Sequence, residues 1–165
     1  MVRIAAIADA GGIARVHIAS WQVAYEGVFS HDFLGSLDLE VRTGWWEALL
    51  LRGERVTFVA DSEEGIAGFS LIGPSDDAGW GEVFAIYVDP AYWARGIGRE
   101  LLTASGLQLA SDGFERALLW VLESNERARA FYERQGWVKG NPIRLETIGG
   151  TEITEVRYER DLELP

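Results

Sequence analysis

Residues 83–102 read VFAIYVDPAYWARGIGRELL, in which a strand, a short loop and the start of a helix follow one another. The apolar first part favours a strand that ends at Asp89-Pro90. In the loop, Gly96 and Gly98 would let a ligand approach the backbone closely. The free N–H groups and the dipole at the start of the helix favour a phosphate. The segment therefore predicts an anion-binding turn. The alternative is that its glycines only separate a strand from a helix.

Arg95 and Arg99 flank this turn and can add charge-assisted hydrogen bonds to an anion. Two well-known phosphate-binding motifs do not fit it. A dinucleotide-binding fingerprint needs Gly or Ala where this chain has Leu101. A P-loop needs Gly-Lys followed by Ser or Thr, but the only lysine of the chain is Lys139, far from the turn. The turn is therefore of neither kind.

Residues 119–137 read LWVLESNERARAFYERQGW and favour a buried strand followed by a short helix. Asn125 and Tyr132 are seven residues apart, which places them on one helix face about two turns from each other. An amide and a phenol arranged in this way can hold an elongated ligand at two points. The alternative is that Asn125 caps the helix while Tyr132 packs in the core.

Hydrophobic periodicity divides the rest of the chain into helices and strands. The expected order is strand, helix, helix, three strands, helix, strand, helix and two strands. This order predicts the α/β class, with a mixed sheet and helices on both of its faces. Strands are expected at 2–7, 55–60, 66–72, 82–88, 116–122, 137–138 and 151–162. Helices are expected at 9–25, 96–112 and 125–135, and a broken helical stretch at 30–51.

Length and composition exclude several classes of protein. The chain has 165 residues, 48% of them hydrophobic, so we expect a single domain, 1–165, with a sizeable core. Its 26 acidic residues outnumber 15 basic ones, which argues against sequence-independent nucleic-acid binding. Without cysteine it has no disulfide, no thiolate metal ligand and no cysteine nucleophile. Its apolar runs are too short for a membrane span, and no signal-peptide pattern is present, so a cytoplasmic protein is expected.

The two segments resemble the signature regions of the GCN5-related N-acetyltransferases, which move acetyl from acetyl-CoA to an amine. In that family a strand ending Val-x-Pro precedes the turn Arg/Gln-x-x-Gly-x-Gly/Ala. Here the matching residues are Val88, Pro90, Gly96 and Gly98. Trp93 stands at the Arg/Gln position, a departure that weakens one outer phosphate contact and leaves the backbone turn.

The family's second signature reads Asn-x-x-Ala-x-x-x-Tyr-x-x-x-Gly-Phe. It is matched by Asn125, Ala128, Tyr132, Gly136 and Trp137. Similarity to a bacterial subgroup extends to residues 13–27, to Arg42 with Trp45 or Trp46, and to residues 155–158. The resemblance covers essentially the whole chain and implies a mostly antiparallel sheet.

The resemblance implies direct transfer of acetyl from acetyl-CoA to a primary amine of a small molecule or peptide. Strand 82–88 would part from strand 116–122, and the pantetheine arm would enter the opening. A strand N–H would steady the thioester oxygen, and Asn125 would bond the pantetheine chain. The implied cofactor-binding residues are Ile86, Val88, Arg95, Gly96, Ile97, Gly98, Arg99, Asn125 and Tyr132.

Tyr132 is the implied general acid for the departing thiolate. Because a tyrosine has a pKa of about 10 and a thiol one of about 8.5, full proton transfer is uphill by roughly 2 kcal/mol. A hydrogen bond that strengthens as the sulfur gains charge is the better description. Glu82, on the strand facing the opening, is the expected general base. Some family members carry a glutamate five residues before the Asn, where this chain has Trp120.

Trp21, Tyr25 and Glu26 are the residues expected to bind the acceptor, and Trp45 and Trp46 are further candidates for the wall of its site. Residues 1–90 hold fourteen acidic residues against five arginines, which predicts a cationic amine as the acceptor. The entrance is expected near Glu26, Asp32 and Asp38. The alternative is that the acidic surface only aids solubility.

A second hypothesis is a catalytically degenerate module that binds acyl-CoA as a sensor, because Trp93 and Trp120 both depart from the family pattern. Retention of Tyr132 favours the enzyme. The resemblance also allows a homodimer. No metal is expected, since the two histidines have no metal-site spacing: His17 is predicted to be packed, and His31 to lie near a helix start.

Overall fold

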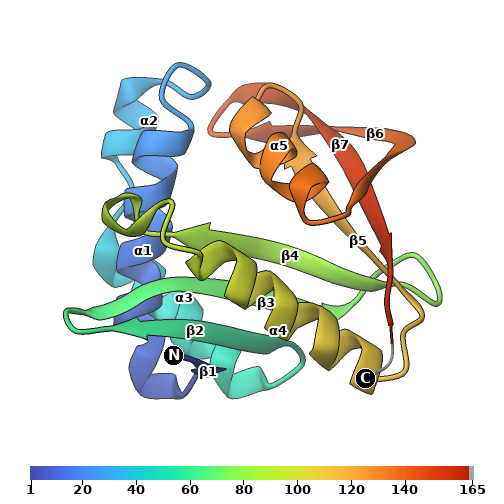
Figure 1. Cartoon of the computed structure of the whole chain (residues 1–165). Coiled ribbons are helices and arrows are strands. Elements are labelled where there is room, and N and C mark those ends of the chain that lie inside the picture. The colour runs from blue at the N-terminus through green and yellow to red at the C-terminus, as the bar shows by residue number, and fades with distance from the viewer. Residues whose placement is uncertain (164–165) are drawn as a thin grey trace.

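The computed structural model describes residues 1–163, which form a mixed sheet with helices on both faces (Figure 1). Within these residues seven strands lie in the order β1-β2-β3-β4-β5-β7-β6, and only β4 and β5 are parallel neighbours. The strands are β1 (Val2–Ile4), β2 (Val56–Ser62), β3 (Gly65–Pro74), β4 (Gly81–Val88), β5 (Arg116–Leu122), β6 (Val138–Ile148) and β7 (Thr151–Asp161). The helices are α1 (Ala10–Ala24), α2 (His31–Gly35), α3 (Leu39–Arg52), α4 (Ile97–Ser111) and α5 (Glu126–Arg134), with 3-10 turns at Ile7–Asp9 and Pro90–Tyr92. The predicted α/β class is confirmed.

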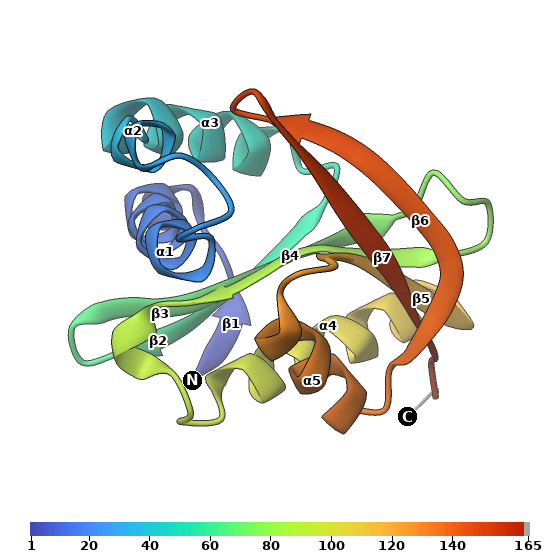
Figure 2. The same ribbon diagram turned by 90° about the horizontal axis from the view of Figure 1, so that it is seen from above.

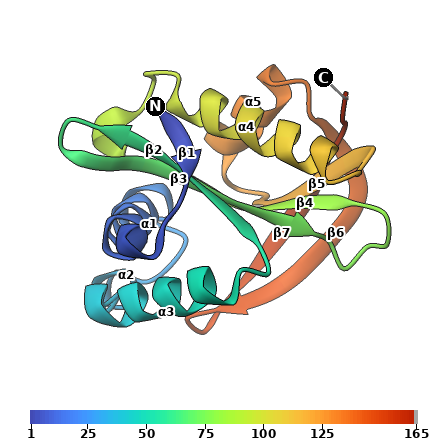
Figure 3. The same ribbon diagram turned by 90° about the horizontal axis from the view of Figure 1, so that it is seen from below.

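Each face of the sheet has its own apolar core. Helices α1, α2 and α3 cover one face, and α4 and α5 cover the other (Figures 2 and 3). Trp46 and Phe69 are buried on the α1–α3 side, while Leu101 and Tyr158 are buried on the α4 side. Each large apolar side chain buried in this way contributes about 1.5–3 kcal/mol, so the two cores hold the sheet firmly between them. Of the helices in residues 1–163, none is both long enough and apolar enough to span a membrane.

Strand β4 contains a bulge in its middle. Leu71 of β3 pairs with Ala85, but the next β3 residue, Ile72, pairs with Val83, so Phe84 has no partner across the strand. Bulges of this kind bend a strand and can end its pairing. The parallel pairing of β4 with β5 does end here, because its last pair is Val83 with Leu119. Beyond this point the two strands lose their mutual hydrogen bonds, as the family resemblance implied for strands 82–88 and 116–122.

The hairpin of β6 and β7 reaches across to α2, as Figure 2 shows. Phe29, Leu34, Leu122 and Ile153 are buried together beneath its tip. At the tip itself, Gly149 lies so close to the Phe33 ring that a Cβ on it would be 2.5 Å from a ring carbon. The hairpin and α2 therefore close one side of the molecule by direct contact.

Three predicted elements differ from the structure. The first strand stops at Ile4, because Asp9 accepts the Ala6 N–H at 2.7 Å and closes a 3-10 turn. The broken helical stretch predicted at 30–51 is two separate helices, since Asp38 accepts the Val41 N–H at 2.8 Å and caps a new start. Strand β6 extends over 138–148 rather than 137–138. As an edge strand it tolerates the proline and polar residues that conceal it in the sequence.

The contact between the hairpin tip and α2 gives a stability prediction. Replacing Gly149 with Ala should lower the free energy of unfolding by about 2–5 kcal/mol, because it adds overpacking against Phe33 to the strain of a φ of +55°. The matched control is Gly150→Ala, which has φ +79° and nothing within 4 Å of the new Cβ, so only about 1–2 kcal/mol should be lost. Urea unfolding measures both. Equal losses would show that the tip does not press on α2.

Candidate functional site

A cleft of about 1230 Å³ opens where β4 and β5 separate. Its volume exceeds the 300–1000 Å³ typical of small-molecule sites. The walls come from α1, β4, the loop after β4, β5 and α5, with Arg144 of β6 and Glu155 of β7. The two segments singled out in the sequence therefore line one cavity. They meet because β4 and β5 are neighbours in the sheet, and the loss of pairing between these strands opens the cavity between them.

The backbone N–H and C=O groups of every second residue of β4 point into this cleft. The Asp89 N–H donates to the Ala67 carbonyl on β3 at 2.8 Å, so the polar backbone groups of Ile86 and Val88 point the other way, toward the gap. One of them is already satisfied. The Val88 carbonyl accepts the Trp93 indole N–H at 2.7 Å and the Ser20 hydroxyl at 3.1 Å.

The loop after β4 has the form predicted for an anion-binding turn. Gly96 has a φ of 86° and precedes the first residue of α4, a conformation that glycine adopts without strain. Its carbonyl accepts the Glu100 N–H at 3.1 Å, which is the first bond of the helix. The N–H groups of residues 97–99 therefore have no acceptor within the helix. Both Arg95 and Arg99 line the cleft here, and Arg95 lies over the Tyr92 ring at 5.0 Å.

Asn125 and Tyr132 both line the cleft, as their spacing on one helix face predicted. Asn125 also caps α5, accepting the Ala128 N–H at 3.1 Å, and Tyr132 is 7% exposed within the α4-side core. Burial raises the pKa of Tyr132 above its usual value. The hydroxyls of Tyr25, Tyr92 and Tyr158 are hydrogen-bonded, whereas that of Tyr132 has no side-chain partner within residues 1–163. Its proton is therefore available to a ligand.

Glu82 lies deep in the cleft wall, at the end of β4 where pairing with β5 is still intact. Its Oε2 accepts the Ser75 hydroxyl at 2.7 Å. Burial raises the pKa of Glu82, and the Ser75 hydrogen bond offsets part of that shift. A buried carboxylate with a raised pKa is a stronger base than an exposed one.

Tyrosines form the wall on the α1 side. The hydroxyls of Tyr25 and Tyr87 are 3.1 Å apart, and both residues line the cleft. Tyr87, which the sequence analysis did not single out, is placed there by the alternation of β4 after the bulge. Its ring stacks on His17 at 5.3 Å, and burial lowers the pKa of His17 to about 3, so this imidazole is neutral and packed as predicted.

Several expected acceptor residues lie outside the cleft lining. Trp21 stacks on Phe29 instead, with ring centroids 5.7 Å apart, and Glu26 is an exposed residue after the end of α1. Trp46 is 1% exposed in the core and donates its indole N–H to His17 at 3.2 Å, so it is not a cleft wall. Trp45 is likewise absent from the lining.

The acidic residues of the cleft also differ from those expected. Neither Asp32 nor Asp38 lines it. The cleft acids besides Glu82 are Asp76, Asp77 and Glu155, of which Glu155 accepts a hydrogen bond from Arg144 at 2.5 Å. Asp76 and Asp77 lie in the turn between β3 and β4, which the sequence analysis treated only as a turn. Local sequence gave no sign that this turn reaches the cleft.

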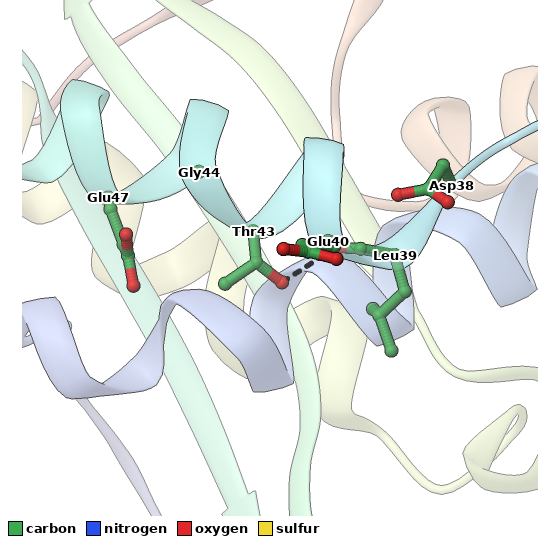
Figure 4. A pocket seen from close by; sticks show the side chains of 6 residues that line it. All are labelled: Asp38, Leu39, Glu40, Thr43, Gly44 and Glu47. Atoms are coloured by element: carbon green, nitrogen blue, oxygen red, sulfur yellow. Dashed lines mark hydrogen bonds between the residues drawn. The ribbon is translucent and has the colours of Figure 1, made fainter.

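A second hollow, of about 830 Å³, runs along α3 and is separate from the cleft (Figure 4). Its lining residues are Asp38, Leu39, Glu40, Thr43, Gly44 and Glu47. Two of the polar groups there serve the helix itself, because Asp38 caps it and the Thr43 hydroxyl donates to the Leu39 carbonyl at 2.7 Å. The residues that line the hollow include no basic side chain, and of the predicted site residues only Asp38, expected near the acceptor entrance, is among them.

The sequence model of the acetyltransferase (GNAT) family matches residues 18–137. The chain is 36% identical over 128 residues to the N-acetyltransferase YuaI of Bacillus subtilis, covering 75% of this chain and 72% of that protein. It is 35% identical over 113 residues to the mycothiol acetyltransferase of Beutenbergia cavernae, covering 66% of this chain but only 36% of that protein. The solved PaiA N-acetyltransferase of Thermoplasma acidophilum, in complex with coenzyme A, superposes with a TM-score of 0.75 at 21% identity over 98% of both chains. The cleft between parted strands, its glycine turn and the family match lead to one conclusion: this chain belongs to the GNAT family of acetyltransferases.

Proposed function

We propose that residues 1–165 form a single domain that transfers acetyl from acetyl-CoA to a primary amine of a small molecule or peptide. The observation that carries this proposal is the cleft itself. It joins an anion-binding turn, an unpaired strand, a tyrosine with a free hydroxyl and a buried glutamate in one cavity. A site that only stored acyl-CoA would need neither of the last two groups. This favours the enzyme over the degenerate binding module.

The residues present fit an acetyl-CoA molecule. The N–H groups of residues 97–99 are free to hold the pyrophosphate, with Arg95 and Arg99 beside them. A Cβ on Gly98 would lie 3.4 Å from the Phe131 ring and 3.8 Å from the Val88 side chain, so the glycine keeps this part of the turn open. The backbone of Ile86 and the amide of Asn125 line the path between the strands, where a pantetheine chain needs hydrogen-bond partners.

When bound, acetyl-CoA supplies an activated acetyl group as a thioester. The β4 N–H groups that face the gap would donate to the thioester oxygen, where negative charge develops. The chain has no cysteine for an acyl-enzyme route, which favours direct attack by the amine.

Tyr132 would donate a hydrogen bond to the sulfur. Since burial raises its pKa, complete transfer of its proton to a thiolate is less favourable still than for an ordinary tyrosine. The hydroxyl therefore stabilises the departing sulfur without giving up the proton.

Glu82 is the proposed general base. It belongs to the face of the sheet opposite Val83, toward Ser75 and Arg144, whereas Tyr132 packs in the α4-side core. The acid and the base thus approach the gap from its two sides. The amine would enter beside Tyr25. Four carboxylates, those of Asp76, Asp77, Glu82 and Glu155, line the cleft; Asp77 pairs with Arg157 and Glu155 with Arg144, while Asp76 and Glu82 have no ion-pair partner within residues 1–163. This charge favours a cationic acceptor.

The open turn at Gly98 predicts a binding defect. Gly98→Val should weaken acetyl-CoA at least tenfold, because the γ-carbons would extend into the space above Phe131 where the phosphates approach the backbone. Gly106→Val is the matched control: it places the same residue in the same helix, outside the cleft lining. Titration calorimetry measures the dissociation constants. Normal binding by a folded Gly98→Val protein would show that this glycine serves only the chain turn.

Tyr132→Phe should lower kcat by ~10–10⁴-fold and leave the dissociation constant for acetyl-CoA nearly unchanged, because it removes only the hydrogen bond to the sulfur. The control is Tyr158→Phe, a buried tyrosine outside the cleft whose hydroxyl donates to Glu133 at 2.6 Å. Release of free thiol measures turnover. An equal loss of binding and rate would mark Tyr132 as a packing residue, and an unchanged rate would show that its hydroxyl takes no part in the transfer. A wild-type chain that binds acetyl-CoA without releasing thiol would favour the sensor module.

The raised pKa of Glu82 predicts the acid side of the pH profile. A base acts only when deprotonated, so kcat/KM should fall as the pH drops through this pKa, at a higher pH than an ordinary glutamate would give. Glu82→Gln should lower kcat/KM and abolish its dependence on pH in this acidic range. The control is Glu155→Gln, which changes another largely buried carboxylate of the cleft. It should leave the fall of kcat/KM at low pH in place. Loss of this fall in Glu155→Gln alone would assign the base to Glu155.

A further inference from the structure

Trp93 is the first residue of the turn between β4 and α4, and it is firmly held. Its indole N–H donates to the Val88 carbonyl at 2.7 Å, which fixes the ring at the end of β4. One face of this ring is covered by the guanidinium of Arg127, whose Cζ lies 3.4 Å from the ring centroid. The other cation–π pairs that involve an aromatic residue of the cleft are longer: Arg55 is 3.6 Å from Phe84, Arg144 is 4.7 Å from Trp120 and Arg95 is 5.0 Å from Tyr92. Arg127 is therefore the cation held most closely by an aromatic ring at this turn.

Arg127 has no protein anion of its own. Carboxylates pair with Arg15, Arg144 and Arg157, but none within residues 1–163 lies at ion-pair distance from Arg127. Burial against its neighbours lowers the pKa of Arg127, which agrees with a cation that lacks such a partner. Stacking uses only the faces of a guanidinium, so its N–H donors remain free at the edge. Arg127 lines the cleft, and its donors are available to a ligand there.

The position of the pair specifies the kind of ligand group. Trp93 begins the same turn whose far end offers the free N–H groups of residues 97–99. A planar fork of donors beside such a turn suits an oxyanion that accepts two parallel hydrogen bonds, as a phosphate does. Trp93 itself brings no charge to the turn, and Arg127, from the first turn of α5, supplies one across the cleft.

We infer that Arg127, held against the Trp93 ring, donates to the pyrophosphate of acetyl-CoA and closes the phosphate site from the α5 side. The inference rests on the proposed function, because it assumes that acetyl-CoA occupies the cleft. It adds a contact that the turn alone does not make: the pyrophosphate is gripped between two elements, α4 and α5, that reach the cleft from separate parts of the chain. Trp93 is a positioning residue in this arrangement.

The test compares three probes whose phosphates differ. Acetyl-CoA carries the pyrophosphate and a 3′-phosphate, 3′-dephospho-acetyl-CoA carries only the pyrophosphate, and S-acetylpantetheine carries neither. Arg127→Met keeps an unbranched side chain and removes the charge, and it should weaken acetyl-CoA and the dephospho compound alike by about 10–100-fold. S-acetylpantetheine should bind as tightly as it does to the wild type. Arg127→Lys should recover only part of the loss, since an ammonium lacks the planar fork.

Arg116→Met is the matched control, because Arg116 lies over the Trp80 ring at 4.5 Å and lies outside the cleft lining. It should bind all three probes normally. Titration calorimetry gives the dissociation constants, and thermal unfolding checks that each variant is folded.

The possible failures are distinguishable. A wild-type chain that binds no acetyl-CoA overturns the proposed function itself. If the wild type binds and Arg127→Met binds equally well, only the role of Arg127 is overturned. A loss shared by S-acetylpantetheine would show that Arg127 acts through the fold. If Arg127→Met weakens acetyl-CoA but not the dephospho compound, Arg127 contacts the 3′-phosphate, and the pyrophosphate assignment is overturned.

Discussion

One unpaired residue in β4 controls the architecture of this protein. Phe84 has no partner on β3, and one residue before it the pairing of β4 with β5 ends. Backbone groups inside a protein must find partners, so a gap in a sheet is costly unless something fills it. Part of that need is met internally, since Ser20 and Trp93 both donate to the Val88 carbonyl. The remaining groups are left for a ligand, and the cavity is a direct result of interrupted pairing.

The residues proposed to act in the cleft come from both faces of the sheet. Tyr132 belongs to the core beneath α4, while Glu82 and the Tyr25–Tyr87 pair lie toward α1 and the β6–β7 hairpin. Arg95 and Arg99 line the cleft at the turn before α4, Asp76 and Asp77 line it at the turn between β3 and β4, and Arg144 and Glu155 pair with each other in the wall. A substrate pair that meets in the gap would therefore have its anionic partner on one side and its cationic partner on the other. Separation of charge along one cavity orients both molecules before any reaction occurs.

Features that depend on neighbouring residues could be predicted from the sequence, and features that depend on distant contacts could not. The glycine turn, the α5 cap and the shared face of Asn125 and Tyr132 follow from local spacing. The bulge could not be predicted, because residues 83–88 are apolar throughout and give no alternation to interrupt. Tyr87 and Arg127 were missed for a related reason: each gains its role from a partner more than thirty residues away. Trp46 was a candidate for the wall of the acceptor site, but its contact with His17 places it in the core.

The edges of the sheet have a consequence for how these molecules behave at high concentration. An exposed edge strand is a template on which another chain can add a strand, and long flat edges promote aggregation. Here β1, at one edge, is only three residues long. At the other edge, β6 has eleven residues, but its register with β7 shifts between Lys139 and Ile143, and Pro142 there lacks an N–H to donate. The irregular stretch that made β6 hard to predict thus also interrupts the edge on which a second chain could add a strand.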